Sequence, residues 1–329
     1  MMLENLFFLL VSCAVLVKSA DVMVKSIGRI AIFFNMSGFA ISFVLIAFAT
    51  SIPELSIGIA SAIEKTPEIV IGNVIGSNVA NATMIMGIVA LLARRVGAGS
   101  NINMRDTMHI FAIMAVPIIL MLNGKLERID GIVLLAVFLW YSMWLITKDR
   151  KISKVNENGG RDGVSVGQLL WSVLALLASL AILFVSADFI IRFAKEFSTE
   201  IGLPLILISL FLISFGTTLP ELTFGVRAAF MGRGDMAIGD TLGTLVANST
   251  VVLGVSALIA PIELSGGSFL LFITSAFFML TAGFIFLTFL GSEEGLTWRE
   301  GIGLIMLYTL FILVMFTIET VSIGRVGVV

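Results

Sequence analysis

The sequence of 329 residues predicts an all-α, polytopic membrane protein with ten transmembrane helices in two inverted five-helix repeats. Composition is the first reason. Hydrophobic residues make up 58% and charged residues 13%, with a mean hydropathy of +1.10, whereas about a quarter of the residues of a soluble protein are charged. An internal repeat is the second reason: AFATSIPELSIGIASA around Glu54 returns as SFGTTLPELTFGVRAA around Glu221, 167 residues later (221 − 54 = 167). The same offset relates Asn81 to Asn248.

The transmembrane helices follow from apolar stretches of about 20 residues, the length that crosses a bilayer. Their expected limits are 5–24, 34–60, 69–93, 107–123, 129–147, 166–191, 203–230, 236–260, 267–291 and 301–321. The domains expected from them are a first five-helix repeat at 1–147, a polar cytoplasmic linker at 148–165 and a second five-helix repeat at 166–329. The first stretch is followed by Lys18, Asp21 and Lys25 and not by a small-residue cleavage site, so we expect a retained helix.

Lysine and arginine in the loops predict the orientation. With the N-terminus outside, the cytoplasmic loops hold thirteen of these residues, and the outside loops and the tail hold six. We therefore expect a multi-pass protein of the cell membrane with both termini outside. Because each half has an odd number of spans, the second half enters the membrane upside down relative to the first. That arrangement is typical of secondary transporters with a binding site near the midplane.

The second and seventh spans each place a glutamate in an apolar stretch, where an ionised carboxylate costs at least a few kcal/mol. The patterns are TSIPE, from Thr50 to Glu54, and TTLPE, from Thr217 to Glu221. The proline should break or kink the helix and free the carbonyl at about the threonine. Carboxylate, hydroxyl and carbonyl oxygens are the ligands that Ca²⁺ and Na⁺ prefer. The alternative is an ordinary kink with a neutral glutamate. The motif occurs twice at equivalent positions, which favours a shared cation site instead.

The third and eighth spans carry polar residues four positions apart, which places them on one helical face. They are Asn73, Ser77 and Asn81 in the first copy, and Asp240, Thr244 and Asn248 in the second. Glycines beside them, among them Gly72 and Gly76, permit close approach of helices. The alternative is that these polar side chains only hold helices together, and it applies most to Asn73 and Asp240.

These two repeats resemble the α-repeats of the Ca²⁺/cation antiporter superfamily, and most closely its prokaryotic sodium/calcium exchanger branch. The resemblance covers about residues 5–321 and rests on the proline-glutamate break and the G-N-x-x-G-S-N-x-x-N-like helix, each present twice. It implies ten spans, inverted halves and alternating access to a central site. It also implies that the helices corresponding to the first and sixth spans slide across a rigid core.

The resemblance further implies the roles of individual residues. Ca²⁺ would be held by the carboxylates of Glu54 and Glu221 and by the main-chain carbonyls of Thr50 and Thr217. The residues implied to form neighbouring Na⁺ sites are Ser51, Thr218, Ser77, Thr244, Asn81 and Asn248. Asp240 and Asn73 are further candidates for the metal site.

This chain departs from the family pattern in three places. Asn248 stands where some relatives carry aspartate, which makes a potassium requirement less expected. Asp240 replaces an expected asparagine, and Ala49 replaces a usual glycine. Asp240 is open to three interpretations: a cytoplasm-facing helix cap, a proton-responsive group or an extra ion contact.

Together these features predict a secondary active antiporter, not an enzyme, that exchanges Ca²⁺ for Na⁺. A Ca²⁺/H⁺ antiporter on the same scaffold is the alternative, because a buried glutamate can take up protons. Two weaker alternatives are a channel and an intramembrane aspartyl protease, the latter suggested by a G-x-G-D string at 232–235.

The partners expected are the transported ions Ca²⁺ and Na⁺, or H⁺, and the lipid bilayer. No cofactor and no nucleic acid are expected. A monomer is the default assembly, with the oligomeric state left open by the sequence.

Overall fold

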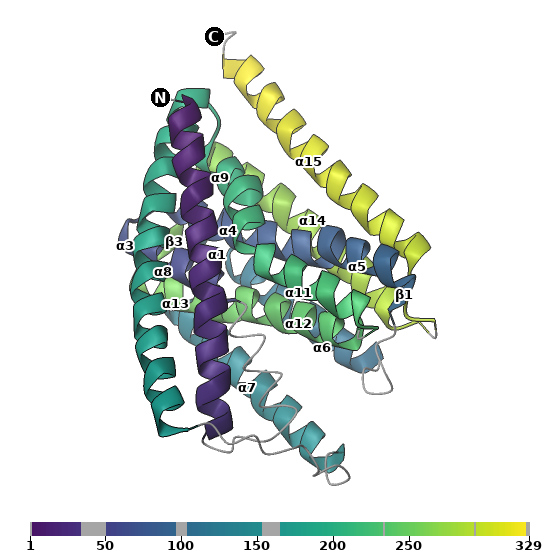
Figure 1. Ribbon diagram of the computed structural model, residues 1–329. Coiled ribbons are helices and arrows are strands. Elements are labelled where there is room, and N and C mark those ends of the chain that lie inside the picture. Colours follow the sequence, from purple (N-terminus) through teal and green to yellow (C-terminus); the bar gives the residue numbers. More distant parts are fainter. Residues whose placement is uncertain are drawn as a thin grey trace.

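Figure 1 shows the computed structural model of the protein, which is built almost entirely of helices. The structure describes residues 2–33, 51–96, 104–152, 165–232, 234–292 and 294–326. Among these, seven helices are long and apolar enough to cross a membrane, or eight if one bent pair is a single span. Two shorter apolar helices lie where the second and fourth spans are predicted. The multi-pass all-α architecture is confirmed, whereas the total of ten spans and the inversion of the halves stay predictions.

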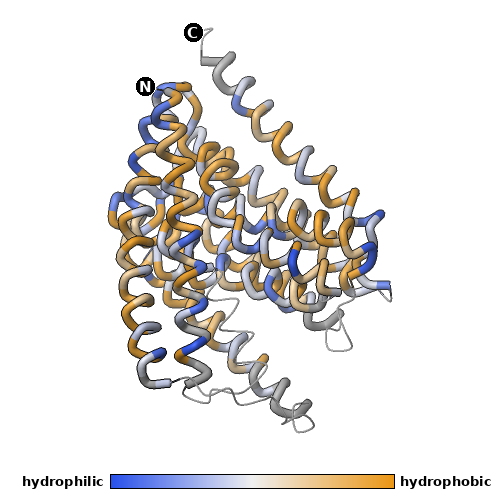
Figure 2. The backbone as a smooth tube through the Cα atoms, in the orientation of Figure 1, coloured by the Kyte–Doolittle hydropathy of each residue, from blue (hydrophilic) through white to orange (hydrophobic). Residues whose placement is uncertain are grey.

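Two long helices stand side by side at one edge of the molecule (Figure 1). They are α1 (Met2–Phe33) and α8 (Val166–Ile201). At a rise of 1.5 Å per residue they are about 48 and 54 Å long, well beyond the hydrocarbon thickness of about 30 Å. Figure 2 shows that both are mainly apolar, as contact with lipid tails requires, and that their hydrophilic residues gather toward their C-terminal ends.

Both helices extend further than their predicted spans, by nine or ten residues at the C-terminal end. In α1 an ion pair of 2.7 Å between Lys25 Nζ and Asp21 Oδ2 stabilises this polar extension. The α8 helix begins after a capping box at Ser165 and ends at Gly202, whose φ of +68° closes the last turn. Hydropathy alone found the apolar stretch, whereas the caps at Ser165 and Gly202 mark where α8 begins and ends.

The break predicted in the seventh span is present. The seventh span consists of α9 (Leu205–Ile208), η3 (Ser209–Ile213), α10 (Ser214–Thr217) and α11 (Leu219–Phe230). It bends by 45° between Thr217 and Leu219, next to Pro220. In the second span only α3 (Ile52–Ile63), which also has proline in its first turn, lies within the described residues. Residues 34–50, including Thr50 and Ala49, lie outside them.

The third and eighth spans form the interior and share a local irregularity. The third consists of α4 (Pro67–Ala80), η1 (Asn81–Ile85) and α5 (Met86–Ala93). The eighth consists of α12 (Gly234–Ala247), η4 (Asn248–Val252) and α13 (Leu253–Ile259). The two π-helical turns, η1 and η4, begin at equivalent positions of the repeat. Single π turns inside α-helices are frequently found at functional sites.

Four outer helices complete the fold and pack on this interior. They are α6 (Met104–Leu120), α7 (Arg128–Ile152), α14 (Gly266–Leu290) and α15 (Trp298–Val326). The α7 helix packs on α13, and α15 packs on α5. Both crossings bring backbones into contact through small residues. A Cβ on Gly131 would lie 2.7 Å from the carbonyl oxygen of Gly254, and one on Gly87 would lie 2.7 Å from that of Gly301.

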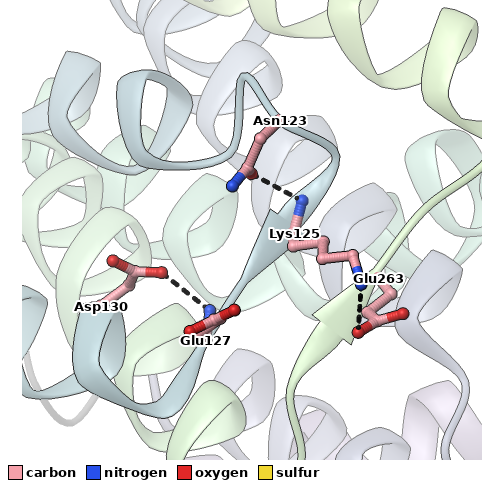
Figure 3. A network of polar contacts seen from close by, with 5 residues as sticks. All are labelled: Asn123, Lys125, Glu127, Asp130 and Glu263. Carbon is pink, nitrogen blue, oxygen red and sulfur yellow. Dashed lines mark hydrogen bonds and ion pairs between the residues drawn. The ribbon is translucent and has the colours of Figure 1, made fainter.

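Two short antiparallel strand pairs join the halves of the chain. The strands are β1 (Arg95–Val96), β2 (Lys125–Leu126), β3 (Ile262–Glu263) and β4 (Leu296–Thr297). β1 pairs with β4, and β2 pairs with β3. Figure 3 shows the second pair, where Lys125 Nζ donates to Glu263 Oε1 at 3.1 Å and the backbone N–H of Glu127 donates to Asp130 Oδ2 at 2.8 Å. Each pair therefore takes one strand from each half.

Candidate ion-binding site

The two glutamates of the repeated motif lie in the first turns of α3 and α11 and are completely buried. Glu54 is 0% exposed and Glu221 is 1% exposed. Within the described part of the chain, none of their four carboxylate oxygens has a hydrogen-bond partner. The two carboxylates lie close enough for their charges to repel each other. An unpaired buried charge is costly, so this arrangement calls for a compensating cation or for protons.

Hydroxyl and amide groups from the two halves meet beside Glu54. Thr217 Oγ1 lies 3.4 Å from Ser77 Oγ and donates to Asn73 Oδ1 at 3.1 Å. Both hydroxyls are near the Glu54 carboxylate without hydrogen-bond geometry to it. The helices also approach closely at a glycine, as predicted. A Cβ on Gly76 of α4 would lie only 2.2 Å from the carbonyl oxygen of Leu210 in η3. The structure thus brings α4 of the first half directly onto α10 of the second.

Asn81 and Asn248 open the two π turns and are completely buried. Asn81 Nδ2 donates to the Ser77 carbonyl oxygen at 2.9 Å, which leaves its Oδ1 without a donor among the described residues. Neither polar atom of Asn248 has a partner there, and the same holds for the buried Ser51 hydroxyl. Thr218 differs because its hydroxyl donates to the Ser214 carbonyl oxygen at 2.9 Å. Several oxygen atoms are therefore free to contact an ion.

Three further predicted residues have different outcomes. Thr50 lies outside the described residues. Thr244 is completely buried in α12. Asp240 is buried in the middle of α12, which begins at Gly234, so the helix-cap interpretation is wrong. Its charge is near enough to repel those of Glu54 and Glu221, although the three carboxylates do not form a compact metal-binding group.

The donor set suits a hard cation. Among the described residues, no three histidine, cysteine, aspartate or glutamate side chains form a compact metal-binding group. A bound ion would therefore combine carboxylates with hydroxyl, amide and carbonyl oxygens, as Ca²⁺ and Na⁺ sites do. Soft metals prefer sulfur or imidazole ligands, and Cys13 packs against Gly216 without belonging to such a group.

One polar contact near the site was missed by the sequence analysis. Asn78 is completely buried, and its Nδ2 donates to Ser249 Oγ at 2.9 Å, which joins α4 to η4. The four-residue spacing drew attention to Asn73, Ser77 and Asn81 and passed over this neighbour. An asparagine in the middle of an apolar helix was the available signal, since such residues form hydrogen bonds across helices in membranes.

The sequence matches the profile of the sodium/calcium exchanger protein family over residues 4–147 and 171–317. The chain belongs to this family. The sodium/calcium exchanger MaX1 of Methanosarcina acetivorans is 29% identical, over 97% of this chain and 100% of the relative. The inner membrane protein YrbG of Escherichia coli is 26% identical, over 78% of this chain and 80% of the relative. The family resemblance seen in the sequence is confirmed.

A solved sodium-calcium exchanger shares the fold. The structure of NCX_Mj soaked with 2.5 mM Na⁺ and 10 mM Sr²⁺ superposes with a TM-score of 0.65 at 23% identity. The superposition covers 94% of this chain and 98% of the other. The exchanger fold therefore extends over nearly the whole chain.

Proposed function

We propose that this chain is a secondary active antiporter that exchanges Ca²⁺ for Na⁺ by alternating access to a central two-glutamate site. The observation that carries the proposal is the pair of buried carboxylates, Glu54 and Glu221, whose oxygens have no partner among the described residues. Membership of the sodium/calcium exchanger family and the name of the relative MaX1 support the choice of ions. Transport of ions needs no catalysed reaction, so the chain is not an enzyme and needs no cofactor.

The proposed ligands are those of the repeated motifs. Glu54 and Glu221, with the carbonyls of Thr50 and Thr217, hold Ca²⁺. The side chains that hold Na⁺ in neighbouring positions are Ser51, Thr218, Ser77, Thr244, Asn81 and Asn248. Asp240 and Asn73 are secondary contacts. The 3.4 Å approach of Ser77 to Thr217 supports overlapping sites, because one oxygen cluster then serves both ions.

Overlap makes the exchange obligatory. Two glutamates supply a charge of −2, which neutralises one Ca²⁺ or is compensated in part by several Na⁺. Since both ions use the same oxygens, one must leave before the other binds. An empty site retains uncompensated charge in a low-dielectric interior, so its crossing is unfavourable. Only the loaded site changes its access from one side to the other.

Inverted halves provide two equivalent states for this change of access. The 167-residue offset, the matching π turns and the reciprocal strand pairs β1–β4 and β2–β3 all support a twofold relation between the halves. In this proposal α1 and α8 slide over the interior helices. The protein lies in the cell membrane with both termini outside, and residues 148–165 join the halves in the cytoplasm.

Flux in proteoliposomes tests the proposal. Purified protein is reconstituted, and uptake of ⁴⁵Ca²⁺ is measured with an outward Na⁺ gradient, with a pH gradient, or with neither. We expect uptake only with the Na⁺ gradient. Uptake driven by a pH gradient alone would mean that the counter-ion is H⁺ and not Na⁺. Passive uptake without either gradient, together with single-channel currents, would indicate a channel.

A further inference from the structure

The helices α3 and α11 occupy equivalent positions in the repeat but are covered to different extents. Ser56 in α3 is only 3% exposed, whereas its equivalent in α11, Thr223, is exposed. Ile57 is 0% exposed, whereas its equivalent, Phe224, is only half-buried. Near the glutamate, one face of α11 is therefore open where the same face of α3 is covered, whereas at the far ends of the two helices Phe230 and its equivalent Ile63 are both exposed.

The long helix α8 causes this difference. Ile57 of α3 belongs to an apolar cluster with Ala187 and Ile190 of α8. At the end of α3, Lys195 Nζ contacts Glu64 Oε2 at 3.2 Å. No described side chain of α11 belongs to that cluster. On its side, α1 makes a close contact before the helix break, where a Cβ on Gly216 would lie 2.8 Å from the sulfur of Cys13.

The open face of α11 carries a positive charge. Thr223, Arg227 and Phe230 are exposed and recur at helical spacing, so they share one face. Arg227 forms no ion pair with any residue that the structure describes. It follows Glu221 by six residues, which is at most about 9 Å along the helix. The equivalent position in α3 is Ala60, so the charge is present on one side only.

This depth indicates what the face contacts. The hydrocarbon core extends about 15 Å from its midplane, so with Glu221 at the proposed central site Arg227 lies within the core. An arginine within that depth is tolerated where it faces a water-filled cavity, or where its side chain reaches to the interface. Thr223, one turn nearer the glutamate, is also exposed and too short to reach the interface. The geometry therefore favours water over lipid along this face.

We propose that the face formed by Thr223, Arg227 and Phe230 lines a water-filled vestibule on the α11 side, and that Arg227 gives this vestibule a positive potential. The vestibule leads to Glu221, while the matching route along α3 is closed by α8. A fixed positive charge repels a divalent ion twice as strongly as a monovalent one. Arg227 is thus a specificity-determining residue that disfavours Ca²⁺ relative to Na⁺ on this side. The depth argument rests on the central position proposed for Glu221, and the last step rests on the proposed exchange of Ca²⁺ for Na⁺.

Cysteine labelling tests the vestibule without any need for transport. In a Cys13→Ala background, Thr223→Cys and the matched Ser56→Cys are reconstituted into liposomes without Na⁺ or Ca²⁺. Charged, water-soluble methanethiosulfonate reagents are then supplied on both sides of the liposome membrane. A thiol in hydrocarbon stays un-ionised and unreactive, so modification reports water. We expect Thr223→Cys to react at least about tenfold faster, as for a dominant one-sided state. Equal rates, or faster reaction of Ser56→Cys, would overturn the proposal.

The sign of the reagent tests the role of Arg227. For Thr223→Cys, the ratio of modification rates by an anionic and a cationic reagent is measured with and without Arg227→Gln. At a charge separation of about 8 Å in water, loss of one charge should lower that ratio about fivefold, and less in high salt. Arg128→Gln, on an exposed residue at the start of α7, serves as the control and should leave the ratio unchanged. If the ratio is unchanged in Arg227→Gln, Arg227 does not give the vestibule a positive potential.

Transport then distinguishes this inference from the proposed function. Arg227→Gln should lower the Ca²⁺ concentration for half-maximal flux several-fold and lower that for Na⁺ by only about the square root of that factor. If labelling follows the expected pattern but no Na⁺-driven Ca²⁺ flux occurs, the vestibule stands and the proposed exchange is wrong. If flux occurs but Arg227→Gln does not change the Ca²⁺ dependence, the role in specificity is wrong.

Discussion

Glu54 and Glu221 are unusual at the level of single residues because each carboxylate is fully buried and lacks a donor among the described residues. Most buried polar groups in proteins are hydrogen-bonded. Here the missing partners mean that the empty site is destabilising in its ionised form, and that an arriving cation removes this penalty. Binding should therefore stabilise the fold as well as fill the site.

Glu54→Gln and Glu221→Gln should each abolish Ca²⁺ transport and leave the protein folded. Loss of one member of a buried charge pairing costs about 3–5 kcal/mol, which corresponds to a loss of Ca²⁺ affinity of about a hundredfold or more. The ion-free melting temperature should stay the same or rise, because the amide is neutral. The rise in melting temperature on Ca²⁺ addition should disappear. Flux and thermal unfolding in detergent measure both effects.

Glu263→Gln is the control for these variants, because its carboxylate pairs with Lys125 at the surface. We expect this variant to keep normal flux and the normal response to Ca²⁺. Near-normal Ca²⁺ flux in either buried variant would mean that the two glutamates do not share the ion.

Asn248→Asp should change the ion dependence without destroying transport. The substitution adds a carboxylate among groups that already repel one another, so the site should bind more positive charge, as protons or as an additional cation. Flux is measured with and without K⁺ and across a range of pH, with Asn123→Asp in the loop before β2 as the control. A profile identical to that of the unchanged protein would show that Asn248 does not contact the ions.

At the residue level the sequence predicted much of the candidate site, because its residues are repeated at a fixed spacing. Ser77 and Thr217 are both predicted site residues although 140 positions apart, and the structure brings their hydroxyls to 3.4 Å of each other. Asp240 shows the limit of prediction from the sequence. The helix-cap interpretation is excluded only by the structure, in which α12 begins at Gly234. The contact of Asn78 with Ser249 depends on how two interior helices face each other, which no local pattern reveals.

Among the elements, the glycine crossings hold the outer helices close to the interior. A Cβ on Gly301 would lie 2.9 Å from the carbonyl oxygen of Gly87 and 2.9 Å from the Cβ of Ala90. Both distances are shorter than a Cβ atom tolerates. Two residues further along α15, a Cβ on Gly303 would meet nothing within 4 Å. The same helix therefore contains a crowded glycine and an unhindered one.

Gly301→Ala should destabilise the protein by about 1–3 kcal/mol, because overpacking forces backbones apart. Gly303→Ala, the matched control, should be neutral or slightly stabilising, since alanine favours a helix by about 1 kcal/mol over glycine. Thermal unfolding of both variants in detergent measures the difference. Equal melting temperatures would mean that α15 does not rest on α5 as the structure shows.

The elements were predictable to the extent that they produce a long apolar signal. The interior spans were found in this way, and the break of the seventh span was predicted from Pro220. The four strands were not, because two residues are too few to show an alternating pattern. The π turns at Asn81 and Asn248 were also missed, since an extra residue in one helical turn leaves no mark on hydropathy.

For the whole molecule, the inversion of the halves gives a topological prediction. Lys65 and Met231 are exposed residues in the loops that follow α3 and α11. They suit labelling better than Thr66, which is buried and donates to the Ser61 carbonyl oxygen. In a Cys13→Ala background, Lys65→Cys should react with an impermeant thiol reagent on intact cells. Met231→Cys should react only after permeabilisation. Labelling of both from outside would contradict inverted repeats.

The reciprocal strand pairs bear on how the chain matures during synthesis. β1 and β2 emerge from the ribosome in the first half, yet their partners β4 and β3 are made only near the end. The crossing of α5 with α15 has the same order. A nascent chain that stops after residue 147 thus has unpaired strand edges in the loops between its spans and uncovered glycine faces in the bilayer. The helices of the first half can complete their packing only after the C-terminal quarter has been synthesised. The first half alone should therefore be a substrate for membrane proteases.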